Sequence, residues 1–202
     1  MKSNISEEYL QYSKKIGNRK SLYKKVINKY GIKSILYPGS HIDIAPSFII
    51  PKVTYVDNFK GTIKFFKELE DVNNYINIYK EYIESPEISF INQDYYNELN
   101  IDKVDMIISQ YAGFVGQATK KYLKTGGILL CNDSHKDATL AYNDVEFKLI
   151  AVINSNNEIS EKNLEQYFKL PQNKEFDIEN VKKTMKGPKY LVNSENYIFI
   201  KI

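Results

Sequence analysis

The stretch "SILYPGSHIDIAPSFIIPKVTYVD", residues 34–57, decides the fold. Two short runs rich in β-branched and aromatic residues, 34–37 and 53–56, flank a loop that contains Gly39 and three prolines. Short apolar runs bounded by Pro and Gly are typical of buried strands. The second run ends on a single acid, Asp57. The stretch therefore predicts two neighbouring strands, with polar side chains placed where the strands end.

The same alternation continues through the rest of the chain. Further strands are predicted at 87–92, 104–109, 127–132 and 147–153, and helical spacing is found at 59–83, 113–123 and 161–170. Asn58 is expected to cap the helix that begins at 59, and the end of the chain, 189–202, is typical of a hairpin turning at Asn-Ser-Glu-Asn. This order predicts an α/β fold: a doubly wound, mostly parallel seven-stranded sheet with an antiparallel C-terminal hairpin.

The N-terminal segment has a different character. Residues 6–30 have apolar side chains at helical spacing, interrupted near Gly17 and Asn18, and Gly31 is expected to end the second helix. Cationic side chains on this segment are interpreted as a solvated face rather than an RNA-binding surface, namely Lys14, Lys15, Arg19, Lys20, Lys24 and Lys25. We expect an N-terminal helical cap at 1–31 and a Rossmann-like domain at 32–202, compact as a whole.

Composition excludes several classes of protein. No apolar run reaches the length of a membrane helix, and no apolar segment of the signal-peptide type follows the first charges. The single cysteine, Cys131, excludes an internal disulfide and a cysteine-built zinc site, and it is expected in the core. The two histidines lack H-x-x-x-H spacing, so no metal site is expected. The net charge of +3 and the single arginine, Arg19, give little support to nucleic-acid binding, and a cytoplasmic location is expected.

Polar side chains of short reach follow each predicted strand. Parallel strands place their carboxyl ends at one edge of a sheet, where ligands of such folds bind. Both histidines of the chain are among these residues. The set comprises Gly39, Ser40, His41 and Asp43 after the first strand, Asp57 after the second, Asp94 after the third, Ser109, Gln110 and Tyr111 after the fourth, and Asp133, His135 and Asp137 after the fifth.

On these residues the chain resembles the class I S-adenosylmethionine-dependent methyltransferases, as an atypical bacterial branch with a degenerate glycine loop. The similarity covers about 32–202 and rests on the motifs "ILYPGSHID", "VTYVD", "INQDYY", "VDMIISQYAGF" and "YLKTGGILLCNDSH". The loop departs from the family pattern, because Tyr37 stands at the place of an acid and Gly39 is its only glycine. The resemblance implies that S-adenosylmethionine is the cofactor. It implies cofactor contacts from Tyr37, Gly39, Ser40, His41, Asp57, Asp94, Ser109 and Gln110.

Within the family pattern, Asp57 would bind the ribose hydroxyls and Asp94 the adenine amine. Each residue also has a simpler interpretation: Asp57 as a turn or cap acid, and Asp94 as the acceptor of an Asx-turn. His135 is a candidate general base near the transferred methyl group, with Asp133 or Asp137 orienting its ring. The alternative for Asp133 is a cap of the following helix.

The implied activity is methyl transfer to an unidentified small-molecule or planar acceptor, on which Tyr111 would stack as a third catalytic-site residue. Two alternatives stay open at this stage. One is a non-catalytic or regulatory protein that retains the methyltransferase fold. The other is an RNA-directed methyltransferase. The sequence does not predict the acceptor or the oligomeric state.

Overall fold

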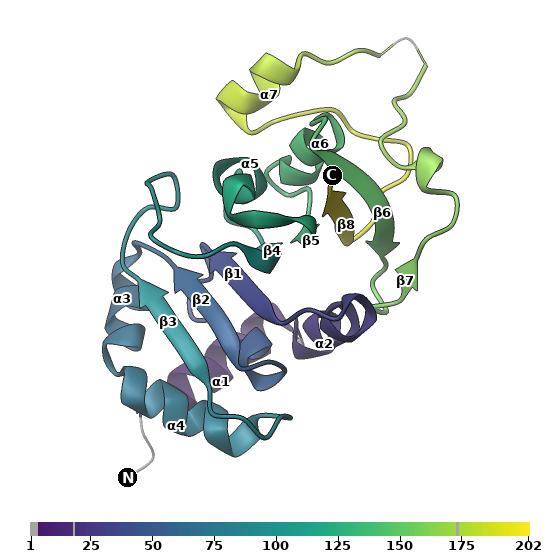
Figure 1. Ribbon diagram of the computed structural model, residues 1–202. Coiled ribbons are helices and arrows are strands. Elements are labelled where there is room, and N and C mark those ends of the chain that lie inside the picture. Colours follow the sequence, from purple (N-terminus) through teal and green to yellow (C-terminus); the bar gives the residue numbers. More distant parts are fainter. Residues whose placement is uncertain (1–3, 18, 173) are drawn as a thin grey trace. The chain divides into compact units, whose positions relative to one another are not determined.

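The computed structural model describes residues 4–17, 19–172 and 174–202. The chain divides into two compact units, residues 1–100 and 101–202 (Figure 1). The division into a cap at 1–31 and a domain at 32–202 stays a prediction. Among the described residues, none of the helices has the length and apolar character needed to span a membrane.

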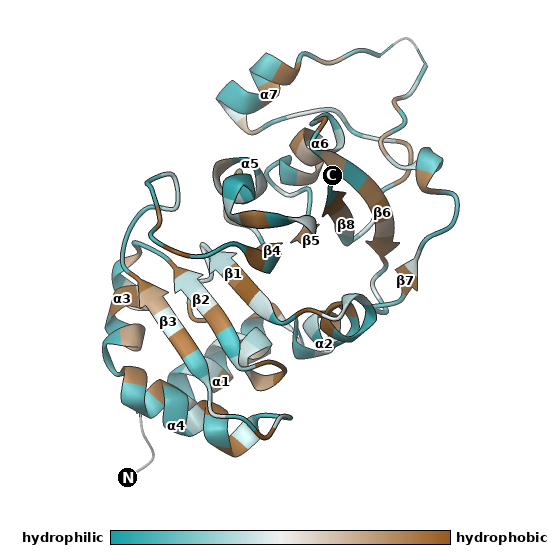
Figure 2. Ribbon diagram, viewed as in Figure 1, coloured by the Kyte–Doolittle hydropathy of each residue, from teal (hydrophilic) through white to brown (hydrophobic). Residues whose placement is uncertain are grey.

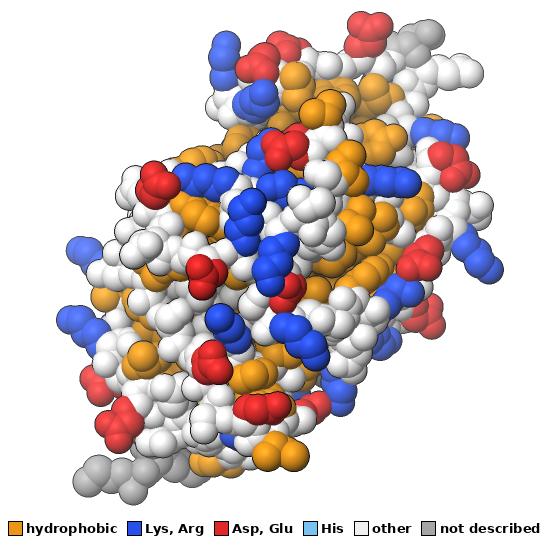
Figure 3. Space-filling view, viewed as in Figure 1, with side chains coloured by type: hydrophobic (Ala, Val, Ile, Leu, Met, Phe, Trp, Pro, Cys, Tyr) orange, Lys and Arg blue, Asp and Glu red, His pale blue; other side chains and the backbone are white. Residues whose placement is uncertain are grey.

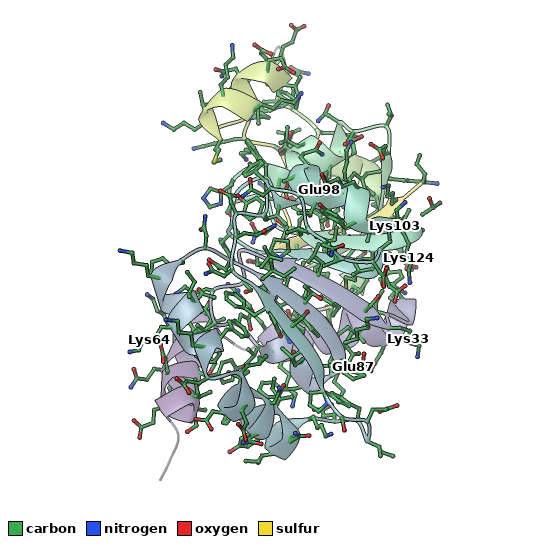
Figure 4. The ribbon with its side chains drawn as sticks, turned by 60° about the vertical axis from the view of Figure 1, so that its left-hand side comes forward. Lys33, Lys64, Glu87, Glu98, Lys103 and Lys124 are labelled. Carbon is green, nitrogen blue, oxygen red and sulfur yellow. The ribbon has the colours of Figure 1, made fainter. Side chains whose placement is uncertain are left out.

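The first unit is built around three parallel strands, β1 (Ser34–Pro38), β2 (Lys52–Val56) and β3 (Glu87–Ile91), in the order β3-β2-β1. Tyr37 of β1 lies opposite Tyr55 of β2, which lies opposite Phe90 of β3. The carboxyl ends of the three strands therefore lie at one edge, as expected. Figure 4 labels Lys33 and Glu87 at the opposite, amino edge of this sheet.

The helices of the first unit are α1 (Asn4–Ile16), α2 (Arg19–Tyr30), α3 (Lys60–Lys67) and α4 (Leu69–Tyr79), with the 3-10 turn η1 (Ala45–Phe48) between β1 and β2. The predicted interruption of the N-terminal helix is confirmed, because Gly17 has φ +81° between α1 and α2; Asn18 lies outside the described residues. The predicted capping role of Asn58 is wrong. The N-cap of α3 is Phe59, whose N–H is bound by the Asp57 carboxylate at 2.8 Å.

The second unit contains β4 (Val104–Ser109), β5 (Leu123–Cys131), β6 (Phe147–Ile153), β7 (Ile159–Ser160) and β8 (Asn196–Lys201), in the order β4-β5-β8-β6-β7. Strands β4 and β5 are parallel, and β8 is antiparallel to both β5 and β6. β4, β5 and β6 therefore run in the same direction. Figure 2 colours β6 and β8 largely hydrophobic, which agrees with their burial in the core of this unit. Cys131 is fully buried there, as predicted.

Short helices complete the second unit: α5 (Val115–Thr119), η2 (Lys120–Tyr122), α6 (Asp137–Tyr142), η3 (Leu164–Gln166) and α7 (Ile178–Thr184). The helix predicted at 161–170 is wrong, since only η3 forms there. Asn163 and Phe168 have φ +52° and +64°, which a helix does not accept, and the Phe168 ring instead stacks on Tyr142 at 4.3 Å. The fifth strand begins at Leu123, four residues earlier than predicted.

The predicted fold class is confirmed: an α/β protein with parallel strands followed by an antiparallel C-terminal part. The described residues form eight strands rather than seven, and the extra one is the two-residue β7. The antiparallel hairpin joins β6 and β7. Of the stretch 189–202, only the second arm forms a strand, because β8 is paired on both of its edges and has no edge left for a hairpin partner.

Candidate functional site

Asp57 fastens the loop after β1 to the start of α3. Its Oδ2 accepts a hydrogen bond from the backbone N–H of His41 at 2.9 Å, and its Oδ1 accepts one from Phe59 at 2.8 Å. The N–H of Gly39 is bound to the Val56 carbonyl at 2.8 Å, so the loop leaves β1 close beside the end of β2. Gly39 and His41 both have positive φ, +61° and +50°, which gives this exit its sharp turn.

The imidazole of His41 packs among aromatic rings. It stacks on Tyr12 of α1 at 4.8 Å between ring centroids and on Phe59 at 5.4 Å. Its Nδ1 is buried without a hydrogen-bond partner among the described residues. Burial lowers the pKa of His41 below its usual value, against the opposing effect of the Asp57 carboxylate. Phe59, beside His41, is 56% exposed. The sequence analysis did not predict Phe59 as a site residue.

Below this loop lies a buried polar cluster around Asp43. Asp43 Oδ2 accepts hydrogen bonds from the Tyr23 and Tyr37 hydroxyls at 2.9 and 3.0 Å and from Arg19 Nη1 at 3.2 Å. Burial and the Asp43 charge raise the pKa of Tyr23 and Tyr37 well above the usual tyrosine value. Tyr37 has no exposed surface. Its hydroxyl is bonded to Asp43 in the interior of the unit, and its predicted contact with the cofactor stays a prediction.

Ser40 and Asp94, the two remaining predicted site residues of the first unit, each form a hydrogen bond within a local turn. Ser40 is buried, and its Oγ donates to the carbonyl of His41 at 3.1 Å, which stabilises the turn. Asp94 follows β3 and accepts a hydrogen bond from the Tyr96 N–H at 2.9 Å, the Asx-turn that the sequence offered as the simpler interpretation. Its role toward adenine stays a prediction.

In the second unit, Ser109 at the end of β4 is turned inward. Its Oγ donates to Asp137 Oδ2 at 2.6 Å, and the N–H of Gly116 donates to the same oxygen at 2.8 Å. Burial raises the pKa of Asp137 to about 6, although these two hydrogen bonds lower it. Asp137 is thus a buried acid joining β4, α5 and α6, and the described contacts do not place it on His135.

A chain of amide groups lies at the carboxyl ends of β4 and β5. Gln110 donates to Asn196 Oδ1 at 2.7 Å, and Asn132 donates to Gln110 Oε1 at 3.1 Å. The Ser134 hydroxyl donates to Asn132 Oδ1 at 2.7 Å and lies 3.1 Å from His135 Nδ1. A hydroxyl has a single proton to give, so these contacts assign the proton of His135 to Nδ1 and leave Nε2 as an acceptor. The sequence reading missed Asn132 and Ser134 as the groups that orient His135.

Asp133 has a structural role in this unit. Its carboxylate accepts hydrogen bonds from the Thr139 N–H at 2.8 Å and the Thr139 hydroxyl at 2.9 Å, and it pairs with Lys136 at 2.8 Å. These contacts hold the first turn of α6, whose N-cap is Lys136, so Asp133 supports the start of the helix without being its N-cap. The structure therefore gives His135 its orientation through Ser134 and not through Asp133.

A polar cavity of about 460 Å³ lies at the carboxyl ends of β4, β5 and β6. Its volume is within the usual range of small-molecule sites. Tyr111, with φ +58° and a side chain 56% exposed, stands at its wall. Tyrosine, amide, hydroxyl and charged groups make up the lining: Tyr111, Asn132, Asp133, Ser134, Lys136, Asn154, Ser155, Tyr167, Asn193, Ser194, Glu195 and Tyr197.

The predicted residues thus form one group in each unit. Gly39, Ser40, His41 and Asp57 are brought together in the first, while Asp94 follows the next strand. Ser109, Gln110 and Tyr111 follow one strand in the second, where Ser134 orients His135.

No protein-family model matches the chain, and neither does any curated protein. Solved structures do resemble it. A methyltransferase from Geobacter sulfurreducens is 10% identical over 73% of this chain and 82% of its own, with a TM-score of 0.51. A candidate O-methyltransferase from Klebsiella pneumoniae is 8% identical over 92% of this chain and 80% of its own, also with a TM-score of 0.51. A candidate caffeoyl-CoA O-methyltransferase from Staphylococcus aureus is 17% identical, with a TM-score of 0.48, and the alignment covers 65% of this chain and 66% of that protein.

At these identities the likeness is one of fold. The two structures with a TM-score of 0.51 are aligned over most of this chain and most of their own. The predicted α/β order and the parallel strands described above agree with this likeness. The chain therefore has a Rossmann-like α/β fold similar to that of these two solved methyltransferases.

Proposed function

We propose that this protein is an S-adenosylmethionine-dependent methyltransferase that acts on a small or planar acceptor. The first unit supplies the cofactor-binding residues Gly39, Ser40, His41, Asp57 and Asp94. In the second unit, Tyr111 lines the polar cavity and His135 follows Ser134, which also lines it, so these two residues are the candidates for contact with the acceptor. The observation that carries the proposal is the position of Asp57, a carboxylate at the carboxyl end of β2 that also holds the loop leaving β1.

The groups around Asp57 fit the ribose of such a cofactor. A carboxylate offers about four acceptor positions, and two of them are taken by the N–H groups of His41 and Phe59. The others suit the two hydroxyls of an unphosphorylated ribose. The unpartnered Nδ1 of His41 adds a further polar atom in the same loop. The exposed Phe59 ring provides a flat surface on which a nucleobase can stack.

When bound, S-adenosylmethionine supplies an electrophilic methyl group on a sulfonium. The chain's own residues would position the acceptor and take up the proton that it loses. Nε2 of His135 suits the second task, because the Ser134 contact fixes the proton on Nδ1. A neutral imidazole removes a proton near pH 7 without the cost of a strongly basic group.

The cavity of the second unit favours a small polar acceptor. Its amides and hydroxyls can orient hydroxyl or amine groups, and its tyrosines can hold a flat ring. On the face shown in Figure 3, lysine and arginine side chains are interspersed with acidic ones. The cavity therefore supports a small-molecule acceptor, and the face shown in Figure 3 does not present the single-sign surface that a nucleic acid binds.

Calorimetry with S-adenosylhomocysteine, the demethylated product, tests the cofactor site. We expect saturable binding by the wild type. Asp57→Ala removes both the acceptor for the ribose and the anchor of the β1 loop, so it should weaken binding by about tenfold or more. Glu70→Ala, an exposed acid on α4, is the matched control and should bind as the wild type does.

The absence of heat with the wild type, or equal binding by Asp57→Ala, would contradict the proposal. A native mass spectrum of the purified protein gives an independent result, since a retained nucleoside cofactor is expected to add its mass. Cofactor binding with no methyl release onto any acceptor would favour the alternative function, a regulatory protein that keeps this fold.

A further inference from the structure

A second cavity, of about 500 Å³, lies within the first unit between α1, α2, η1 and α4. The cavity is open because the connection between β1 and β2 is short. The polypeptide between β1 and β2 forms only the 3-10 turn η1, restricted by Pro46 and Pro51, instead of a full helix. The turn at Gly17 then lets α1 and α2 enclose the space from the other side. Neither Gly39, His41 nor Asp57 lines this cavity, so it is distinct from the proposed cofactor site.

Aromatic rings make up one wall of the cavity. Tyr9 lies 5.6 Å from Phe48 and 5.7 Å from Tyr75, between ring centroids, and Tyr75 lies 4.7 Å from Tyr79. Leu10 and Ile16 of α1 add aliphatic surface. A wall of this kind buries a flat apolar ring and offers it edge-to-face and stacked contacts.

The charged side chains that line the cavity indicate which charge an aromatic ligand should carry. Lys14, Arg19 and Lys20 line the cavity, while Asp43 is its one acidic lining residue. Asp43 is already bonded to Arg19 and to two tyrosine hydroxyls, so its charge is offset inside the unit. Lys20 reaches Glu81 at 2.9 Å and lies over the Phe48 ring. Lys14 is exposed at the rim. Aromatic walls can also hold a cation, but these lysines would repel one.

We propose that this cavity binds a small aromatic anion of the aryl carboxylate class. The ring would lie against Tyr9, Phe48 and Tyr75, and the carboxylate would face Lys14 at the rim, because Lys20 is already paired with Glu81. Such a ligand satisfies both features of the site, since the ring is desolvated and the charge stays near the rim, where water and ammonium groups solvate it.

Isothermal titration calorimetry with sodium 2-naphthoate tests this site on the full chain. We expect saturable binding of one naphthoate per protein. The uncharged analogue 2-naphthalenemethanol should bind about fivefold more weakly or worse, because it cannot form an ion pair with Lys14. Saturating S-adenosylhomocysteine should leave naphthoate binding unchanged, since the two sites have no lining residue in common.

Two neighbouring lysines of α1 provide a matched pair of variants. Lys14→Glu reverses a charge that lines the cavity and should weaken naphthoate binding about fivefold or more. Lys15→Glu makes the same change one residue away, outside the lining, and should have little effect. Both side chains are exposed, so both variants should fold, as circular dichroism can verify. Ser13→Trp, which fills the cavity, should abolish binding.

The proposal is overturned by any of four results: no saturable heat with the wild type, equal affinity for the alcohol, equal effects of Lys14→Glu and Lys15→Glu, or displacement of naphthoate by the nucleoside. The outcome is separable from that of the Asp57 experiment. Naphthoate binding without nucleoside binding would remove the proposed cofactor site and leave this cavity assigned.

Discussion

Replacing Asp43 by alanine is expected to lower the free energy of unfolding of the first unit by about 3–5 kcal/mol. Asp43 is fully buried and is the shared acceptor for Arg19, Tyr23 and Tyr37, while its Oδ1 accepts from the Ala45 N–H at 3.2 Å. Its removal leaves a largely buried guanidinium and two buried hydroxyls without their common partner. Each loss adds a desolvation penalty that water cannot repay at this depth.

Urea unfolding followed by far-ultraviolet circular dichroism measures this effect. Asp43→Asn keeps an oxygen for the hydroxyl groups but loses the charge that pairs with Arg19, so an intermediate loss is expected. Glu70→Ala on the surface of α4 is the control and should change stability by less than about 0.5 kcal/mol. A loss below about 1 kcal/mol for Asp43→Ala would show that the cluster contributes little to folding.

The strands of this fold were predictable because their apolar runs carry the signal by themselves. The predicted 104–109 and 147–153 agree with β4 and β6 at both ends. The prediction of a helix at 161–170 was wrong because tertiary packing overrides the local pattern. Its residues have helical spacing, but Phe168 is drawn into a cluster with Tyr142, Tyr190 and Tyr197, and the backbone takes a left-handed conformation to reach it.

The candidate site was predictable where topology alone decides it. Asp57 follows a strand, and the parallel order of β1, β2 and β3 places it beside the loop after β1. The contacts that define each side chain were not predictable. Asp43 accepts a hydrogen bond from Arg19, which lies 24 residues away in the sequence. The His41 ring stacks on Tyr12 of α1. Contacts of this kind follow no periodicity in the sequence, because they depend on which segments fold next to each other.

The same limit explains Asp133 and Asp137. Both lie in one polar run after β5, "NDSHKDA", and the sequence cannot say which acid faces His135. In the structure, Asp133 binds the first turn of α6. Asp137 is buried against β4 and α5. A Cβ added at Gly116 would lie 2.8 Å from Leu129 Cδ2 and 3.1 Å from both carboxylate oxygens of Asp137, so a larger residue at this position would displace the Leu129 side chain.

Asp137→Asn is expected to abolish a pH dependence of stability in the second unit. Burial raises the pKa of Asp137 from 3.8 to about 6. A group whose pKa is raised on folding binds its proton more tightly in the native state, so it stabilises the fold at low pH and loses this contribution as the pH rises. The window runs from about pH 4 to pH 6, and a shift of about two units corresponds to about 3 kcal/mol.

The measurement is the free energy of unfolding at about pH 4 and pH 7 for the wild type and the variant. Between these values the wild type should lose up to about 3 kcal/mol relative to Asp137→Asn, whose amide oxygen can still accept from Ser109 and Gly116. Asp144→Asn is the matched control. Burial raises the pKa of Asp144, but hydrogen bonds from Lys120 and from the Glu146 N–H outweigh burial and bring the pKa below its usual value. The contribution of Asp144 to stability is therefore lost only in acid. The difference between that variant and the wild type should therefore stay constant from about pH 5 to pH 7. A wild-type profile parallel to that of Asp137→Asn would mean that Asp137 is ionised in the folded protein throughout this range, despite its burial.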